Sequence, residues 1–165
     1  MWTPDAAGSV RPGGSALSTE ATKAAIRRIP VEVFNQGHLD LVDELFSPAY
    51  IEHALLPPDW PPGVPGLKQF VAALRSAFPD FLYSIEQLIT EGDTVVVHVT
   101  AQGTHLGPFL GVAPTGRRAT WEEIHIYQIA AGQVVEHWVI QDQLGLLQQL
   151  GAMPLLGETV QAAGA

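Results

Sequence analysis

The stretch WEEIHIYQIAAGQVVEHWVIQDQLGLLQQLG, residues 121–151, decides how this chain folds. Apolar residues occupy alternate positions on both sides of Ala130, Ala131 and Gly132. Two such runs around a short turn that contains glycine are typical of an antiparallel hairpin. Asp142 follows the second run, and because aspartate often caps helices, we expect a helix to begin near this residue.

The expected register of the hairpin brings two histidines and a carboxylate together. If the turn places residue 129 opposite residue 133, His125 lies opposite His137. In the same register Glu123 lies opposite Val139. Because side chains of a strand point alternately to two faces, one face is expected to carry Glu123, His125, Tyr127, Val135, His137 and Val139. The other face is expected to carry Glu122, Ile124, Ile126, Gln128, Glu136, Trp138 and Ile140.

The composition narrows the classes of partner. The chain has 165 residues, a net charge of -9 and 47% hydrophobic residues, which fits one compact domain. This negative charge argues against nucleic acid and anionic membrane as partners. The absence of cysteine excludes disulfides and thiolate metal sites. No apolar run approaches the roughly 20 residues of a membrane-spanning helix, and the N-terminus lacks signal-peptide features, so a cytoplasmic location is expected.

The remaining segments predict helices first and strands afterwards. Residues 1–16 and 154–165 are interpreted as tails around one domain, residues 17–153. Helices are expected from residue 19 to 34 with a kink at Pro30, from 40 to 46 and from 66 to 78. Residues 57–65 contain five prolines and predict a loop. Residues 50–54 predict a short strand or an extended segment. Alternating patterns predict strands at 81–89, 94–104, 117–129 and 133–141.

This order indicates an α+β fold, with three N-terminal helices packed on a curved, mostly antiparallel sheet of four strands. A cone of this kind encloses a pocket. The inner face is expected to include Val95, Val97, Val99, Ala101, Gly103 and His105 beside the two hairpin histidines. A single β-bulge would reverse part of this assignment.

Several motifs make the chain similar to a known family. The segments are GTHLGPFLGVAPTGRR, EEIHIYQIAAGQVVEHW and DQLGLLQQLG, with FNQGHLD and FPD as weaker support. From about residue 21 to 151 the chain resembles the SnoaL-like polyketide cyclases, the ester cyclase branch of the NTF2-like superfamily. The resemblance implies closure of aromatic polyketide rings by an intramolecular aldol step, without metal or cofactor, by a buried aspartate and a nearby histidine. His125 matches that histidine, and Val139 stands where the family has its aspartate.

Valine can neither remove nor return a proton, so the chemistry has to come from elsewhere. Glu123, two residues from His125 on the expected inner face, is the candidate replacement. The sequence thus predicts a cofactor-independent cyclase or isomerase for a hydrophobic, polyketide-like carbonyl compound. The alternative is a small-molecule binding protein that has kept the pocket and lost the acid/base group.

Other polar and aromatic residues are candidates for the same pocket. The catalytic candidates are His125, Glu123 and Asp142, although helix capping is the favoured role for Asp142. The substrate-binding candidates are His53, Phe70, His105, Trp121, Tyr127, His137 and Val139. For the histidines outside position 125, hydrogen bonding in the core or in a loop is the alternative, and for Trp121 and Phe70 it is plain packing. The ligand spacing of a metal site is missing, so no metal is expected. The 107–116 loop suits either a lid or a rigid connection.

The outer face of the sheet predicts a homodimer. Ile124, Ile126, Trp138 and Ile140 are large apolar residues on a face that cannot pack against the helices. Such faces are usually covered by a partner, here a second copy of the chain.

Overall fold

The computed structural model of the chain describes residues 19–54, 57 and 59–155. In chain order the elements are α1 (Thr19–Arg28), η1 (Ile29–Asn35), α2 (Leu41–Leu45), β1 (Phe46–Glu52), α3 (Gly63–Ala77), β2 (Leu82–Glu91), β3 (Thr94–Thr104), β4 (Arg118–Ala130), β5 (Gln133–Gln141) and α4 (Gln143–Leu150). Residues 1–16 and most of 154–165, interpreted above as tails, lie outside the described residues. No helix in the described ranges is long and apolar enough to cross a membrane.

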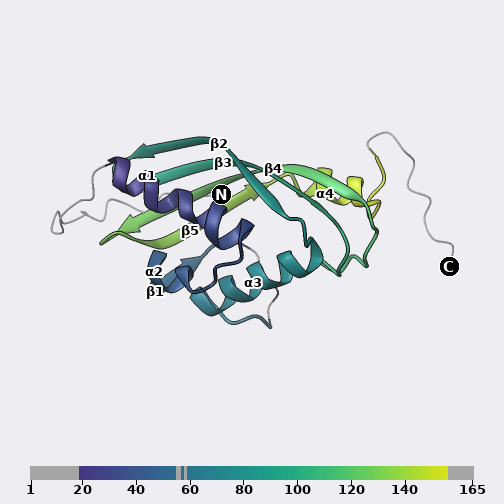
Figure 1. Ribbon diagram of the computed structural model, residues 1–165, viewed down its shortest axis with the longest axis horizontal. Helices are drawn as coiled ribbons and strands as arrows, with labels where there is room; N and C mark the ends of the chain where they lie inside the picture. Colours follow the sequence, from purple (N-terminus) through teal and green to yellow (C-terminus); the bar gives the residue numbers. More distant parts are fainter. Residues whose placement is uncertain (1–18, 55–56, 58, 156–165) are drawn as a thin grey trace, which may run out of the picture.

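The strands form one curved sheet in the order β1-β5-β4-β3-β2 (Figure 1). The expected α+β class and the four antiparallel strands are confirmed, but the sheet has a fifth strand. Phe46–Glu52 pairs in parallel with β5. The sequence predicts only a short extended segment here, because a parallel pair is not joined by a tight turn and leaves no local turn signal. This fifth strand brings Glu52 next to His137.

Prolines mark two helix boundaries. The helix that starts at Thr19 changes from α to π register at Ile29, one residue before Pro30, so the predicted kink is a change of register. Proline lacks the N–H that an α-helix interior needs, which favours such a change. Helix α3 begins at Gly63, earlier than predicted, and it contains Pro65 in its first turn. Proline is tolerated there because the first N–H groups of a helix have no intrahelical partner.

The hairpin register differs from the predicted one by two separate shifts of one residue each. The turn contains only Ala131 and Gly132, both with positive φ, and Ala130 pairs with Gln133. A β-bulge then leaves Val135 unpaired, so that His125 lies opposite Val139 and not opposite His137. The predicted inward direction of Val135 is therefore wrong, and Val134 is the buried residue.

Together the two one-residue shifts move the register by two residues, which leaves the direction of the side chains beyond the bulge unchanged. His137 consequently points to the inner face, as expected, although it pairs with Tyr127. Glu123 pairs with Gln141, so its predicted position opposite Val139 is also wrong.

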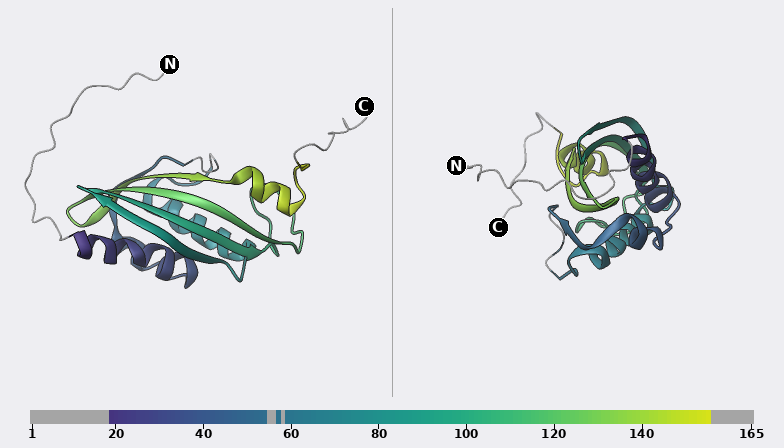
Figure 2. Two further views of the ribbon diagram at one scale, coloured as in Figure 1. Left: turned by 90° about the horizontal axis from the view of Figure 1, so that it is seen from above. Right: turned by 90° about the vertical axis from the view of Figure 1, so that its left-hand side faces the viewer.

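The helices cover the concave face of the sheet (Figure 2). The face expected to point inward on β3 is buried: Val95, Val97, Val99 and Ala101 are at most 1% exposed. Fully buried residues of η1 and α3, among them Val33 and Val71, belong to the same core. The sheet's curvature and this helical cover enclose the site described below.

The outer face carries exposed apolar residues. Ile124, Trp138 and Ile140 are 43%, 37% and 72% exposed, which confirms their predicted direction. His53 covers one side of Trp138 with a ring stacked at 4.4 Å. The homodimer stays a prediction.

If two copies pair through this face, the Trp138→Glu variant sediments as a monomer at micromolar concentration where the wild type is a dimer. Burying a carboxylate against isoleucines without a partner disfavours association. Leu106→Glu, the same change at an exposed apolar loop residue, is the control that stays dimeric. A monomeric wild type would contradict the proposal, and a dimeric Trp138→Glu variant would move the interface elsewhere.

Candidate functional site

A cavity of about 200 Å³ lies between the concave face of the sheet and the helical layer. Its apolar walls are Phe34, Ala54, Leu67, Phe70, Phe109, Leu110 and Val139. Its polar residues are Glu52, Tyr83, Glu123, His125, His137, Gln141 and Gln143. Apolar walls with a small number of convergent polar groups are typical of a site for a small organic molecule.

Strand β4 carries the polar residues at one end of this cluster in the cavity wall. Trp121, Glu123, His125 and Tyr127 alternate along this strand and are all buried. Trp121 Nε1 donates a hydrogen bond of 2.5 Å to Glu123 Oε1. The hydroxyl of Tyr83 donates one of 2.8 Å to Glu123 Oε2. The carboxylate is thus held from two sides.

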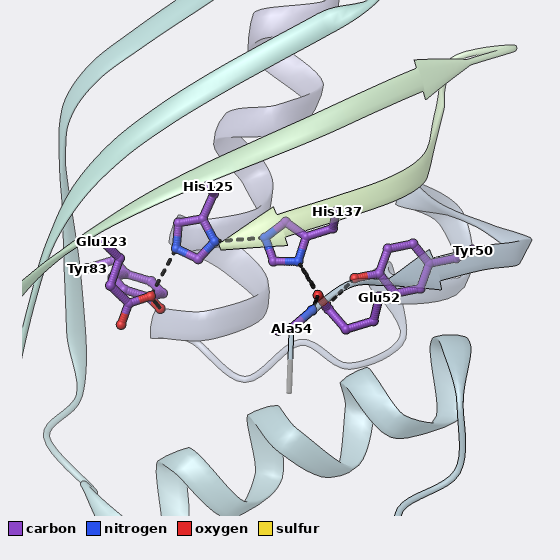
Figure 3. Close-up of polar contacts among 7 residues, drawn as sticks. All are labelled: Tyr50, Glu52, Ala54, Tyr83, Glu123, His125 and His137. Carbon is purple, nitrogen blue, oxygen red and sulfur yellow. Dashed lines mark hydrogen bonds and ion pairs between the residues drawn. The ribbon is translucent and has the colours of Figure 1, made fainter. Parts of the chain in front are cut away.

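The chain of contacts continues across the sheet (Figure 3). His125 Nδ1 lies 2.9 Å from His137 Nε2, and His137 Nδ1 lies 2.8 Å from Glu52 Oε2. Glu52 also accepts hydrogen bonds from the Tyr50 hydroxyl and from the backbone N–H of Ala54. Two histidines are therefore connected in series between the buried carboxylate of Glu123 and the partly buried carboxylate of Glu52.

Among the four ring nitrogens of His125 and His137, Nε2 of His125 differs from the others in its contacts. This nitrogen lies 3.1 Å from Glu123 Oε2, close enough for an ion pair. The direction of the contact does not suit a hydrogen bond, and within the described residues this buried atom has no hydrogen-bond partner. A buried polar atom without a partner in a cavity wall is a site at which a ligand can bind.

The ionisation of these groups follows from their surroundings. Burial raises the pKa of Glu123, but the contacts with His125, Tyr83 and Trp121 more than offset this, so its pKa lies below the ordinary value. Glu52 behaves in the same way: burial raises its pKa, but His137 and Tyr50 lower the pKa by more than burial raises it. Burial lowers the pKa of His137 against the opposing effect of Glu52. Both carboxylates are therefore ionised and His137 favours its neutral form.

Three candidates from the sequence lie outside the cavity wall. Asp142 is exposed and accepts a hydrogen bond from Gly145 N, which makes it the N-cap of α4. His105 is fully buried, stacks on Phe78 and contacts Thr115 of the long loop. His53 stacks on Trp138 and forms an ion pair with Glu136. Their roles in catalysis or substrate binding stay predictions.

The other candidates are at or next to the cavity. Val139 and Phe70 line it, and Trp121 contacts Glu123 from behind. Tyr127 stacks on the rings of both His125 and His137. The 107–116 loop contributes Phe109, which packs against Phe70, so the loop forms part of the wall.

Glu52 is the principal residue that sequence reasoning missed. The alternation from Tyr50 to Glu52 in an expected extended segment puts both on one face, which was the available signal. Without the parallel partner, that face had no known direction. Gln141 and Gln143 were also missed. Within the described ranges, no group of three His, Asp or Glu side chains is placed to hold a metal ion.

Comparison with known proteins agrees with the resemblance seen in the motifs. The model of a family described as SnoaL-like polyketide cyclase matches residues 24–150. The chain is 34% identical over 122 residues to the nogalonic acid methyl ester cyclase of Streptomyces nogalater, covering 73% of this chain and 91% of that protein. It is 32% identical over 136 residues to the aklanonic acid methyl ester cyclase DnrD of Streptomyces peucetius, covering 79% and 92%. The solved structure of TsrD from Streptomyces laurentii is 28% identical with a TM-score of 0.77, covering 84% of this chain and all of that one.

The ionised network predicts that acid destabilises the fold. The pKa of His137 is lowered from 6.5, and those of Glu52 and Glu123 are lowered from 4.5. In each case the unfolded chain binds protons at a higher pH than the native chain does. The free energy of unfolding, measured by urea denaturation, is therefore expected to fall from about pH 7 to about pH 4, by up to about 1.4 kcal/mol per pH unit for each such proton.

The loss of unfolding free energy that is due to the histidines begins below about pH 6.5, and the loss that is due to the carboxylates begins below about pH 4.5. His105, whose pKa is lowered by burial, adds to the first of these losses. The His137→Gln variant should therefore show a shallower slope between about pH 6.5 and 5 than the wild type. Stability that rises on acidification would contradict this description of the network.

Proposed function

The chain belongs to the SnoaL-like polyketide cyclase family, and we propose that it is a cofactor-independent cyclase for a hydrophobic, polyketide-derived carbonyl compound. The observation that carries the proposal is His125 Nε2, a buried ring nitrogen in the cavity wall that has no hydrogen-bond partner among the described residues and lies 3.1 Å from an ionised carboxylate. This is the geometry of an acid/base group whose charged form is stabilised by its neighbour.

The reaction that suits this group is an intramolecular aldol addition. His125 removes a proton from the carbon next to one carbonyl, and that carbon bonds to the carbon of a second carbonyl in the same molecule. The electron pair of the second C=O bond moves to its oxygen. The imidazolium then returns the proton to this oxygen, so the product is an isomer of the substrate and His125 is restored.

Glu123 fits the role of stabiliser better than that of base. Both of its oxygens accept hydrogen bonds, and although burial raises its pKa, the contacts with His125 first, and then those with Tyr83 and Trp121, lower it below the ordinary value. A weakly basic carboxylate removes a carbon-bound proton poorly. Its negative charge beside Nε2, in a buried setting, favours the imidazolium that forms during the reaction.

The cavity supports a hydrophobic, planar ligand. Aromatic and aliphatic side chains form most of its wall, and Phe70 and Phe109 offer ring faces and edges to a bound ring system. Gln141 and Gln143 add amide groups that can donate hydrogen bonds to carbonyl oxygens.

A second candidate function is binding without catalysis. Val139 lines the cavity at the position where the resemblance puts the family's aspartate, and it is paired with His125 in the sheet. A chain that had lost only this group would retain a pocket for a related ligand and return it unchanged.

Incubation with nogalonic acid methyl ester and aklanonic acid methyl ester separates the two functions. A cyclase produces an isomer with the same mass and a different retention time, followed by liquid chromatography with mass spectrometry. The His125→Ala variant is expected to lose about 10²- to 10⁴-fold in kcat, the usual contribution of a general acid/base. His98→Ala, which removes a histidine of the outer face near Glu122, should retain wild-type rates.

Binding of either ester without a product would favour the carrier function. Equal rates for His125→Ala and the wild type would refute the assignment of His125, provided that both proteins give the same circular dichroism spectrum.

A further inference from the structure

Glu52 is a partly buried carboxylate to which neither the motifs nor the reaction above assigns a role. It lies in β1, beside His137 of β5 in the parallel pair, and its side chain is 9% exposed. Its Oε2 accepts a hydrogen bond from the Tyr50 hydroxyl and lies 2.8 Å from His137 Nδ1. Its Oε1 accepts the N–H of Ala54 at 2.9 Å. These contacts fix the orientation of the carboxylate, and within the described residues His137 is the imidazole that it contacts.

The hydrogen bonds determine where protons sit along the chain. An ionised carboxylate only accepts, so His137 Nδ1 carries a proton and donates to Glu52. A neutral imidazole has one donor nitrogen and one acceptor nitrogen, so His137 Nε2 is then an acceptor. Its neighbour at 2.9 Å is His125 Nδ1, which must donate. The remaining nitrogen, His125 Nε2, is the only one from which a proton can leave or to which one can return.

Glu52 and Glu123, at the two ends of the pair of histidines, favour opposite positions for the imidazole protons. If His125 is neutral, a hydrogen bond from its Nε2 to Glu123 would demand the opposite proton positions all along the chain. The contact of His125 Nε2 with Glu123 is poorly directed, and in the part of the chain that the structure describes this nitrogen has no hydrogen-bond partner. The contact between His137 and Glu52, in contrast, is a hydrogen bond. Geometry therefore favours the order of protons that Glu52 sets.

The rings are also held in place by stacking. The Tyr127 ring lies nearly parallel to both imidazoles, 4.8 Å from His137 at 15° and 5.9 Å from His125 at 4°. Exchanging the ring nitrogens by a flip would break the hydrogen bonds of both histidines at once. The proton order is thus a property of the folded chain without any ligand.

We propose that Glu52 is a positioning residue which, acting through His137, keeps a proton on His125 Nδ1 and so reserves Nε2 for proton exchange with the substrate. For its catalytic meaning this proposal rests on the function proposed above. It gives His125 support from two carboxylates: Glu123 stabilises the positive charge directly, and Glu52 fixes the tautomer from a distance. The family's aspartate, which is valine here, is not needed in this scheme.

The substitution Glu52→Gln reverses the proton order with little change in shape. The amide oxygen can accept from Ala54 N, which places the amide N–H group near His137 Nδ1. His137 Nδ1 must then accept, its Nε2 must donate to His125 Nδ1, and the proton of His125 moves to Nε2. His125 would no longer have a free lone pair towards the cavity.

Two readouts test the proposal. The first is ¹⁵N NMR of histidine-labelled protein without ligand at about pH 8, where imidazoles are neutral. The wild type should show protonated Nδ1 and unprotonated Nε2 on His125 and His137, and Glu52→Gln should show the reverse. The second is turnover of aklanonic acid methyl ester, in which Glu52→Gln should lower kcat by about 10²-fold or more and change KM by less than about threefold.

Glu136→Gln is the matched control. Glu136 also forms an ion pair with a histidine at 2.9 Å, but the pair involves His53 and is about one third exposed. This variant should leave the tautomers of His125 and His137 and the turnover unchanged.

A proton on His125 Nε2 in the neutral wild type, or unchanged tautomers in Glu52→Gln, would overturn the proposal. The wild-type spectrum decides even if Glu52→Gln fails to fold. If the wild type turned over neither ester while its tautomers were as expected, the cyclase assignment would fail and the positioning role of Glu52 would be supported.

Discussion

Two ionised carboxylates lie largely shielded from water on the concave face of the sheet, with side chains 6% and 9% exposed, and the local structure depends on pairing them. A buried charge without a partner is strongly destabilising. Here the charges of Glu52 and Glu123 are met by His137, His125, Tyr83 and Trp121, which come from three strands. The pairing requires β1 to lie beside β5 and the inner faces of β4 and β5 to align. The same constraint that stabilises the buried charges therefore assembles the site.

Much of this arrangement could be predicted from local patterns. Alternation alone places Glu123 and His125 on the inner face, because β4 pairs with β3 without a bulge. His137 has the expected direction only because a shorter turn and a bulge at Val135 compensate each other. Glu52 could not be placed, since nothing in a strand's own sequence specifies a parallel partner that is more than 80 residues away. Long-range pairing, and not residue type, limited the prediction.

The role of Val139 changes when the whole network is considered. A valine in place of a catalytic aspartate suggests an inactive relative, yet this cavity contains more acid/base groups than the single histidine that the motifs identify. The chain belongs to a family of polyketide cyclases, and its curated relatives act as ester cyclases on nogalonic and aklanonic acid methyl esters. In the proposed scheme an imidazole performs the proton transfer, and the carboxylates control its charge and its tautomer. Such a division of roles requires burial, because exposed groups would be screened by water.

Neutron diffraction from a deuterium-exchanged crystal at about pH 8 locates the protons of the network directly, at a pH where free imidazoles are neutral. The scheme predicts deuterium on Nδ1 of His137, directed at Glu52, and on Nδ1 of His125, directed at His137, with His125 Nε2 bare. Deuterium on His137 Nε2, or a deuteron shared between His125 Nε2 and Glu123, would contradict it.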